Sequence, residues 1–323
     1  MSQQSGANVK LVYDTETTYK TNPVSPDGMI LPFVSESLKL SRGQVASKTI
    51  RSDRNPQMTK RGGYNVAGDL NFELSPEYGR LLKHIFGSYS KTGSSAPYTH
   101  TYKIGSLPVG MLIEKQFTDL AVPKYFIYNG VRVNTFKLSA KPEGMIDCSV
   151  GLIGAKETIG VAAYDSTVTD LGHSPFDGFE AAITQGGASL GIGTSLEFTL
   201  ENVLDDKNFV IGGGGERYSL PAGTAKVNGS VDVLFENDTL YALAVADTET
   251  TLVLEFGRGN KLGGSAGNEC LTFYFDELKF GPESPVVTGP TGLLVKLGFS
   301  AFYNDGANAS ACRAVLLSPI ATF

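Results

Sequence analysis

The sequence has little of the chemistry that metal sites and disulfide frameworks need. Its 323 residues include no tryptophan and only three cysteines and three histidines. The cysteines are odd in number and widely spaced, with no Cys-x-x-Cys pair, so they predict neither a disulfide framework nor a zinc site. We expect small buried or free thiols in a protein made in a reducing cell. The histidines have no carboxylate or cysteine at ligand spacing, and we expect them at the surface or in turns: His84, His100 and His173.

Long apolar runs and an excess of basic charge are also missing. No stretch reaches the roughly 18 apolar residues that cross a bilayer. The first 20 residues, MSQQSGANVKLVYDTETTYK, lack the apolar core of a secretory signal. We therefore expect a soluble protein without a membrane anchor. The formal net charge of −6 argues against a surface that grips nucleic acid, because such binding needs lysine and arginine to displace phosphate counterions.

The sequence gives little support to catalytic or nucleotide-binding motifs. It has no His-Glu-x-x-His helix, and its two Gly-x-Ser-x-Gly matches, GASLG at 187–191 and GGSAG at 263–267, lead into strand-like segments rather than into the helix of a nucleophile turn. The glycine-rich stretch IGGGGERY at 211–218 has no following Gly-Lys-Ser/Thr, and GGASLGIGTSLEF at 186–198 runs into a strand rather than a helix, so both are typical of hairpin tips. The adjacent Asp205 and Asp206 lie in a loop and give little support to a carboxylate pair for hydrolysis. We predict no enzyme activity and no cofactor.

What the sequence does contain favours strands. Glycine is abundant at 38 residues, and Phe and Tyr are common at 18 and 14. Together with frequent Val and Thr, this composition favours many short strands and turns over helix bundles. We predict an all-β protein with minor α, with one short helix in each half of the chain.

One stretch of the sequence returns in a second copy. GDLNFELSPEYGRLLKHIFGS at 68–88 is matched by GSVDVLFENDTLYALAVAD at 229–247. With Gly68 over Gly229, apolar residues occupy every second position in both copies, as in a strand with one buried face. Each alternation then stops at a helix-start signal, and helical spacing takes over. In the first helix we expect one face to be buried and the other to be polar: Tyr78, Leu81, Leu82, Ile85 and Phe86 against Glu77, Arg80, Lys83 and His84.

The repeat extends over most of the chain. SPDG at 25–28 is echoed by SPFDG at 174–178, and SLKLS at 37–41 by SLEFT at 195–199. Strand-like segments follow each helix: 109–117, 124–140 and 144–155 in the first half, and 250–257, 269–281 and 291–303 in the second. Because each sheet must bury one face, we expect each half to form a two-layer sandwich or a curled barrel. The predicted organisation is an N-terminal arm at 1–24, a first domain at 25–160, a linker at 161–173 and a second domain at 174–323.

The long loops of the two copies differ in charge. The loop from 42 to 63 is cationic, with Asp53 its one acid, and carries Arg42, Lys48, Arg51, Arg54, Lys60 and Arg61. It lacks the aromatic side chains that stack on bases, so a solvated or protein-facing loop is favoured over a nucleic-acid patch. The loop from 201 to 223 is mildly acidic and includes Asp205 and Asp206.

These features together resemble the tail tube (major tail) proteins of long-tailed bacteriophages. The resemblance lies in order and spacing, from ESLKLSRGQ through RGGYNVAGDLNFELSPEYGRLLKHIFG to a second copy opening DGFEAAITQGGASLGIGTSLEFTLEN. It implies a β-sandwich flanked by one helix, with a long hairpin-like loop that reaches neighbouring rings. In that family six such domains form a ring, and rings stack into a tube through which the genome leaves the capsid.

Two domains in one chain imply homotrimeric, pseudo-hexameric rings, although six chains per ring with the second copy outside as decoration remain an alternative. The implied partners are the chain itself and the tape-measure, terminator and distal tail proteins, in a virion tail assembled in the host cytoplasm. DNA would pass through without specific binding. We expect the cationic loop and Asp205 and Asp206 to make contacts between rings. A lumen that does not attract phosphate needs acidic or neutral side chains, and the candidates are Asp69, Asn71, Glu73, Glu197, Glu201 and Asp232.

Two other functions fit a tandem β protein. A β-sandwich adhesin or decoration module would expose an aromatic groove, and the absence of tryptophan disfavours it. A hydrolase on a β scaffold is disfavoured because no nucleophile, metal set or acid pair is evident.

Overall fold

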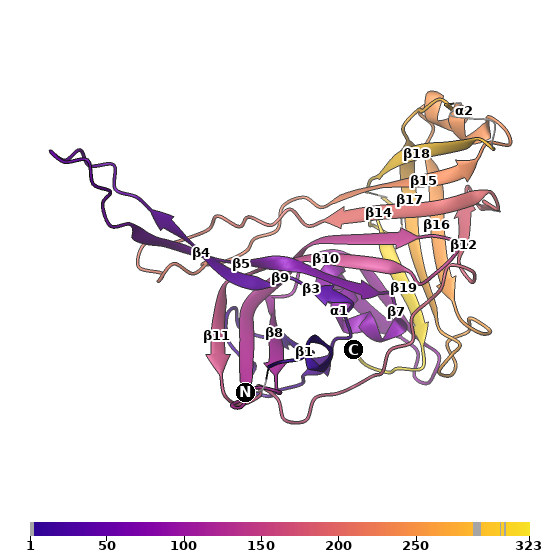
Figure 1. Ribbon diagram of the computed structural model, residues 1–323. Coiled ribbons are helices and arrows are strands. Elements are labelled where there is room, and N and C mark those ends of the chain that lie inside the picture. The colour runs from indigo at the N-terminus through magenta and orange to yellow at the C-terminus, as the bar shows by residue number, and fades with distance from the viewer. Residues whose placement is uncertain (1–2, 287–291, 304, 307) are drawn as a thin grey trace.

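The computed structural model describes residues 3–286, 292–303, 305–306 and 308–323, and it is dominated by β-strands (Figure 1). The prediction of an all-β protein with minor α is confirmed. Each half of the chain contributes one short helix, α1 at Gly79–Phe86 and α2 at Thr239–Val245. Single 3-10 turns lie at Gly6–Asn8 and Pro76–Tyr78. Residues 1 and 2 of the expected N-terminal arm lie outside the described residues.

The strands of the first half are β1 Lys10–Glu16, β2 Met29–Ile30, β3 Ser35–Glu36, β4 Lys39–Val45, β5 Lys60–Glu73, β6 Gly87–Thr92, β7 Tyr98–Ile104, β8 Gly110–Phe117, β9 Lys124–Ala140, β10 Asp147–Gly154 and β11 Lys156–Gly160. Those of the second half are β12 Ala182–Gln185, β13 Ala188–Ser189, β14 Gly193–Glu201, β15 Lys226–Leu234, β16 Thr250–Gly257, β17 Cys270–Phe280, β18 Leu294–Ala301 and β19 Arg313–Ser318. The strands expected after each helix are therefore present.

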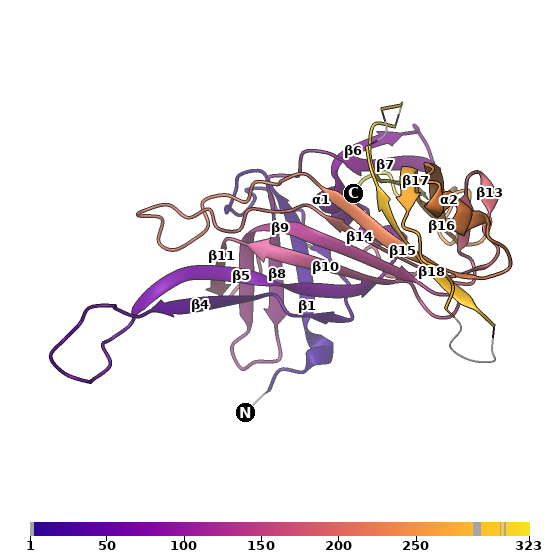
Figure 2. The ribbon, with the colours of Figure 1, turned by 90° about the horizontal axis from the view of Figure 1, so that it is seen from above.

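One antiparallel sheet runs through both halves. Its strands lie in the order β4, β5, β10, β9, β14, β15, β18, with the short β3 beside β4 on β5. We call it the joined sheet. The two halves meet where the second half of β9 pairs with β14, from Thr135 opposite Glu201 to Ala140 opposite Leu196. Figure 2 shows these strands side by side from above.

Two smaller groups of strands form the layer beneath the joined sheet (Figure 1). In the first half, β2, β1, β8, the first part of β9 and β11 lie in this order. In the second half the order is β13, β12, β16, β17, β19, β7, β6, so the hairpin β6–β7 of the first half completes the sheet of the second. The long strands β9 and β17 bend from one layer into the other, which fixes the layers relative to each other.

The core between the layers is continuous from one half to the other. Phe136 of the first half lies with its ring centroid 5.7 Å from that of Phe198 and 6.3 Å from that of Phe273. Phe86 at the end of α1 stacks on Phe273 at 6.4 Å. All four side chains are essentially buried. Because aromatic rings bury large apolar areas, this shared cluster stabilises the contact between the halves.

The strand pairings of the first half recur in the second. The ladders β1–β8, β4–β5, β5–β10, β8–β9, β9–β10 and β9–β11 correspond in order to β12–β16, β14–β15, β15–β18, β16–β17, β17–β18 and β17–β19. Each helix follows the corresponding strand, α1 after β5 and α2 after β15.

The first helix begins and ends close to where the sequence indicates. Pro76 opens a 3-10 turn that leads into α1, and Gly87 follows the helix with φ of 95°, a conformation that glycine adopts without strain. The apolar face is buried as predicted. The prediction of a polar, exposed side for this helix is partly wrong, because Arg80 and His84 are also buried, with exposed fractions of 8% and 3%.

The N-terminal segment explains this error. Residues 10–16, within the stretch assigned to an arm, form β1 and pair with β8 along their full length. Asp14 of β1 lies 3.5 Å from the Arg80 guanidinium, and Thr15 Oγ1 lies 2.9 Å from His84 Nε2. The Arg80 side chain also pairs with Asp27 at 2.5 Å. The helix thus packs against polar partners on the side that its sequence pattern leaves open to water.

Candidate functional site

The upper face of the joined sheet is polar across both halves, and we call it the polar face. In each strand the side chains alternate, so that Leu70 and Phe72 of β5 point into the core while Asp69, Asn71 and Glu73 point out. The other strands keep the same alternation. One row across the sheet reads Asn71, Ser149, Lys137, Thr199, Asn228 and Ser300.

The structure places all six predicted lumen candidates on this face. Asp69 and Glu197 are exposed, and the others are partly exposed. Glu197 accepts a hydrogen bond of 3.1 Å from Ser139 Oγ, Asp232 accepts one of 2.7 Å from Ser195 Oγ, and Glu73 lies 3.4 Å from His173 Nε2. Sequence reasoning missed one further acid, Asp147, which lies opposite Glu73.

Lysines on the same face were also missed, and the alternation rule locates them. Lys39 lies opposite Ala67, Lys137 opposite Ser149, Lys226 opposite Glu201 and Lys296 opposite Asp232. On β4, β5, β10, β9, β14, β15 and β18, outside the projecting hairpin, the six acids Asp69, Glu73, Asp147, Glu197, Glu201 and Asp232 therefore share the face with four lysines, a net charge of −2. At its border Lys279 of β17 lies opposite Ser300 and pairs with Asp247 at 2.8 Å. Acidic and basic side chains are interspersed, so the face is mildly negative rather than strongly charged.

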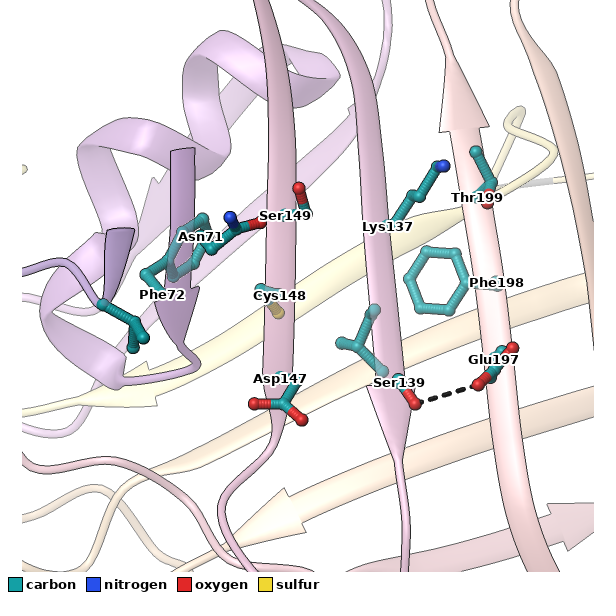
Figure 3. Close-up of a pocket in the computed structure, with 12 residues that line it drawn as sticks. Asn71, Phe72, Lys137, Ser139, Asp147, Cys148, Ser149, Glu197, Phe198 and Thr199 are labelled. Carbon is teal, nitrogen blue, oxygen red and sulfur yellow. Dashed lines mark hydrogen bonds between the residues drawn. The ribbon is translucent and has the colours of Figure 1, made fainter. Parts of the chain in front are cut away.

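A shallow hollow of about 430 Å³ lies on the polar face where the two halves meet (Figure 3). Its polar lining comes from four adjacent strands, β5, β10, β9 and β14, and consists of Asn71, Lys137, Ser139, Asp147, Ser149, Glu197 and Thr199. The lining combines hydroxyls, an amide and charges of both signs along flat strands. It shows neither a nucleophile next to a base nor an enclosed pocket.

The cationic loop forms a long hairpin that projects from the sheet (Figures 1 and 2). It comprises β4, residues 46–59 and the start of β5. Arg42 is partly buried, donates from Nε to the Gly62 carbonyl at 2.9 Å, and stacks over the Tyr64 ring at 4.3 Å. Arg51 pairs with Asp53 at 2.9 Å. Apart from Arg42, the predicted contact residues are exposed: Lys48, Arg51, Arg54, Lys60 and Arg61.

The acidic loop between β14 and β15 folds back onto the first half. The Gly215 carbonyl accepts from the Tyr64 N–H at 2.6 Å, and Lys20 pairs with Glu216 at 3.2 Å. Arg217 is buried and donates to the carbonyls of Val66 and Gly154. Burial lowers the pKa of this guanidinium, although it stays charged. The glycine-rich stretch is thus held by an arginine that the sequence analysis did not single out.

Asp205 and Asp206 lie in this loop but do not meet the cationic hairpin within one chain. The Asp205 carboxylate accepts from the Lys207 N–H at 3.1 Å, and Asp206 lies 4.0 Å from Arg217. Among the described residues, no ion pair joins either aspartate to the hairpin.

The histidine prediction is wrong for two of the three residues. His84 and His100 are buried, and of the three only His173 is exposed. Burial lowers the pKa of His84 to about 3, and nearby Lys83 and Arg80 act in the same direction. His100 is held between the Tyr89 hydroxyl and the Ile320 carbonyl, both at 2.9 Å. Within the described ranges, no group of three or more His, Cys, Asp or Glu side chains is arranged to hold a metal ion.

The prediction of buried, free thiols is confirmed for Cys148, Cys270 and Cys312. Burial raises the pKa of each thiol, which disfavours the reactive thiolate. In the part of the chain that the structure describes, no helix has the length and apolar character needed to cross a membrane.

Comparison with known proteins agrees with this architecture. No curated protein matches the chain. A family model described as phage tail tube protein matches residues 6–301, which spans both halves, the joined sheet and the cationic hairpin. The chain therefore belongs to the phage tail tube protein family.

Proposed function

We propose that this protein is a structural, non-enzymatic subunit whose stacked rings form the tail tube, and that the polar face of the joined sheet lines the channel through which DNA leaves the capsid. One observation carries the proposal: a single sheet runs through both halves and presents one continuous polar face with a net charge of −2. A channel wall for a polyanion needs this combination, because surplus lysine or arginine would hold the phosphates.

The repeated strand pairings support an internal duplication, with one tube domain at 25–160 and a second at 174–323. The two units stand side by side in the joined sheet, so each adds an equivalent sector to the same face. If a ring contains six such sectors, three chains complete it. The alternative, six chains with the second unit outside the ring as decoration, has less support, because the second unit continues the sheet of the first.

The cationic hairpin has the form of an arm toward a neighbouring ring. Its exposed basic side chains suit an acidic surface on another subunit, with Asp205 and Asp206 among the candidates. Exposed ion pairs contribute only about 0 to 1 kcal/mol each, so the hairpin would set register and orientation more than strength. Tape-measure, terminator and distal tail proteins would meet the ends of the tube, in a virion tail assembled in the host cytoplasm.

Negative-stain electron microscopy of the purified chain at rising concentration tests the proposal. We expect rings that stack into tubes with an axial channel. Light scattering of the smallest ring should give about 103 kDa, three times the chain mass of 34.3 kDa. A chain that stays monomeric at every concentration and binds a glycan or a capsid surface would instead be an adhesin or decoration module.

A further inference from the structure

The junction between the two halves contains a register that a second copy of the chain can reproduce. At this junction β14 adds to the free side of β9, with Phe136 opposite Leu200, Lys137 opposite Thr199 and Leu138 opposite Phe198. The strand that corresponds to β14 in the first half is β4. Lys39 lies opposite Ala67 and Thr199 opposite Asn228, so with Gly68 placed on Gly229, Lys39 takes the position of Thr199.

The outer side of β3 and β4 is open. Among the described residues, both strands pair only with β5. The edge carries Lys39 and Arg42, and basic side chains on an edge strand are a common protection against unwanted pairing. At the intrachain junction, β14 pairs with residues 135–140, the second part of β9. Because β17 corresponds to β9 and β4 to β14, the open edge should pair with the segment that continues β17.

That continuation is the segment 281–286, which follows β17 directly. The Gly281 N–H donates to the Gly298 carbonyl at 2.8 Å and extends the ladder in which Phe280 lies opposite Phe299. Beyond this bond, residues 282–286 make no backbone hydrogen bond within the described part of the chain, and Val286 is 67% exposed. Ser284 is exposed, and its Oγ lies 3.2 Å from the Tyr241 hydroxyl, so this side chain points toward the side of the strand that carries α2.

The alternation fixes which side chains of the segment reach the polar face. Phe280 is buried and Ser284 lies on the side of α2, so by alternation Glu283 between Pro282 and Ser284 points to the opposite side, the polar face. Extended by two residues, the register of Gly281 with Gly298 brings Glu283 opposite Lys296 of β18, as Lys137 lies opposite Ser149 of β10. Glu283 therefore takes the position of Lys137, and its counterpart across the open edge is Lys39.

We propose that the open edge of β3 and β4 pairs antiparallel with residues 282–286 of a second copy of this chain, with Lys39 opposite Glu283 of the partner subunit. The inference rests on the proposed ring. It adds the partner surface and the register. Opposite charges meet on the polar face, and Val286 reaches the position that buried Ala140 occupies at the intrachain junction.

The junction between chains should be weaker than the one within the chain. Proline has no N–H, so Pro282 removes one donor that Phe136 can supply. The Leu38 carbonyl on the open edge already accepts from Lys115 Nζ, which leaves it one lone pair for the partner. A junction of this kind can stay open in the free chain and close during assembly.

Cysteine cross-linking tests the register. The Gly281 N–H points to β18, so the backbone N–H and C=O of Glu283, two residues on, point to β18 as well. Because they do not point to the open edge, Lys39 and Glu283 would form a non-hydrogen-bonded pair, with Cα atoms about 4.5 Å apart. That separation suits a disulfide. We expect K39C/E283C to form covalent multimers under mild oxidation, and a largest closed species of three chains on a non-reducing gel. The native thiols are buried and should contribute little background.

Two matched variants make the result specific. K137C/T199C tests the same geometry within the chain and should close as a monomer. S41C/E283C moves one partner by two residues, to a diagonal about 7 to 8 Å away that a disulfide does not span, and should cross-link poorly. As a second measurement, K39E should raise the concentration needed for assembly, and K39E/E283K should restore it.

The outcomes separate this inference from the proposed function. Tubes that form normally while K39C/E283C stays monomeric, with K137C/T199C closed, would overturn the edge pairing and leave the tube proposal standing. Cross-linking that is equal in S41C/E283C would also overturn it. Cross-linked closed trimers that never stack into tubes would support the pairing and count against the tube. Absence of both multimers and rings would remove both.

Discussion

Reversal of charge on the polar face should convert an indifferent channel into one that holds DNA. The perturbation is the triple variant Asp69→Lys, Glu73→Lys and Glu197→Lys. All three carboxylates project from strands without a buried ion pair, and within the part of the chain that the structure describes their side-chain bonds reach only Ser139 and the exposed His173. The sheet should therefore fold normally, because exposed substitutions of this kind usually change stability by about 0.5 kcal/mol or less.

The charge on the face sets the magnitude. Each reversal adds +2, so three reversals change the face of one chain from −2 to +4. A ring of three chains then changes from −6 to +12 on the proposed wall. If all nine new lysines of a ring contacted phosphate, log K for retained duplex would fall with log[salt] at a slope of at most about −8. At physiological salt the Debye length is about 8 Å, so contacts across a narrow channel would remain partly unscreened.

Two assays measure the effect. Phage carrying the triple variant should assemble tails of normal appearance but eject their genome more slowly, with the delay reduced by added salt. Purified tubes of the variant should retain DNA that wild-type tubes release. The control reverses two exposed acids on segments outside the polar face, Asp170 and Glu180. Ejection kinetics that are equal in wild type, variant and control would refute the assignment of this face to the channel.

Three further predictions concern stability and assembly. Gly229→Ala should lower the free energy of unfolding by about 1 to 3 kcal/mol, because its Cβ would lie 2.4 Å from Phe299 Cζ and 2.5 Å from the Glu197 carbonyl oxygen; chemical denaturation compares it with Gly264→Ala, where the Cβ meets nothing within 4 Å. The pKa of His84 is about 3 when folded and about 6.5 when unfolded, so the unfolded chain binds the extra proton and stability falls as pH drops below 6.5, by about 2 kcal/mol at pH 5. His84→Gln should remove that part of the pH dependence in thermal melts, and an unchanged slope would contradict it. Replacing the exposed hairpin residues Arg51, Arg54 and Lys60 by glutamate should raise the concentration needed for tube growth. Unaltered growth would exclude the hairpin from ring contacts.

Much of the fold follows from local patterns, and the errors arise where distant segments meet. Alternation in β5 and β15 predicts which side chains are buried, because a period of two depends only on neighbouring residues. Arg80 and His84 are buried because β1 covers them, and no pattern within the helix reveals a strand that lies some 65 residues earlier in the sequence. The linker expected at 161–173 begins directly after β11, the last strand of the first half.

The sequence predicted most of the acidic residues of the polar face, but it did not predict that lysines lie among them. Asp69 and Glu197 belong to strands that the repeat identified, and their outward direction follows from Leu70 and Phe198 pointing inward. Lys137 and Lys296 lie on strands that were predicted too, but their place beside those acids depends on which strands are neighbours. The sequence comparison aligned residues 37–41 with 195–199. In the sheet Lys39 corresponds to Thr199, so the sequence alignment differs from the structural register by two residues. A shift of two residues keeps every side chain on its face, so the burial pattern could not reveal it.

The same physics accounts for why one junction is made on folding and its counterpart is left open. The pairing of β9 with β14 has a continuous run of opposed residues and an aromatic contact beneath it, between Phe136 and Phe198. Its proposed counterpart replaces Phe136 by Pro282 and Leu138 by Ser284, which removes a donor and most of the buried apolar area. Before assembly, a complete ladder at an exposed edge would pair with any strand it met, whereas prolines and edge lysines suppress that risk. A weak junction that recurs around a closed ring is stabilised collectively, because the last contact forms within an assembly whose other contacts already hold both edges in place.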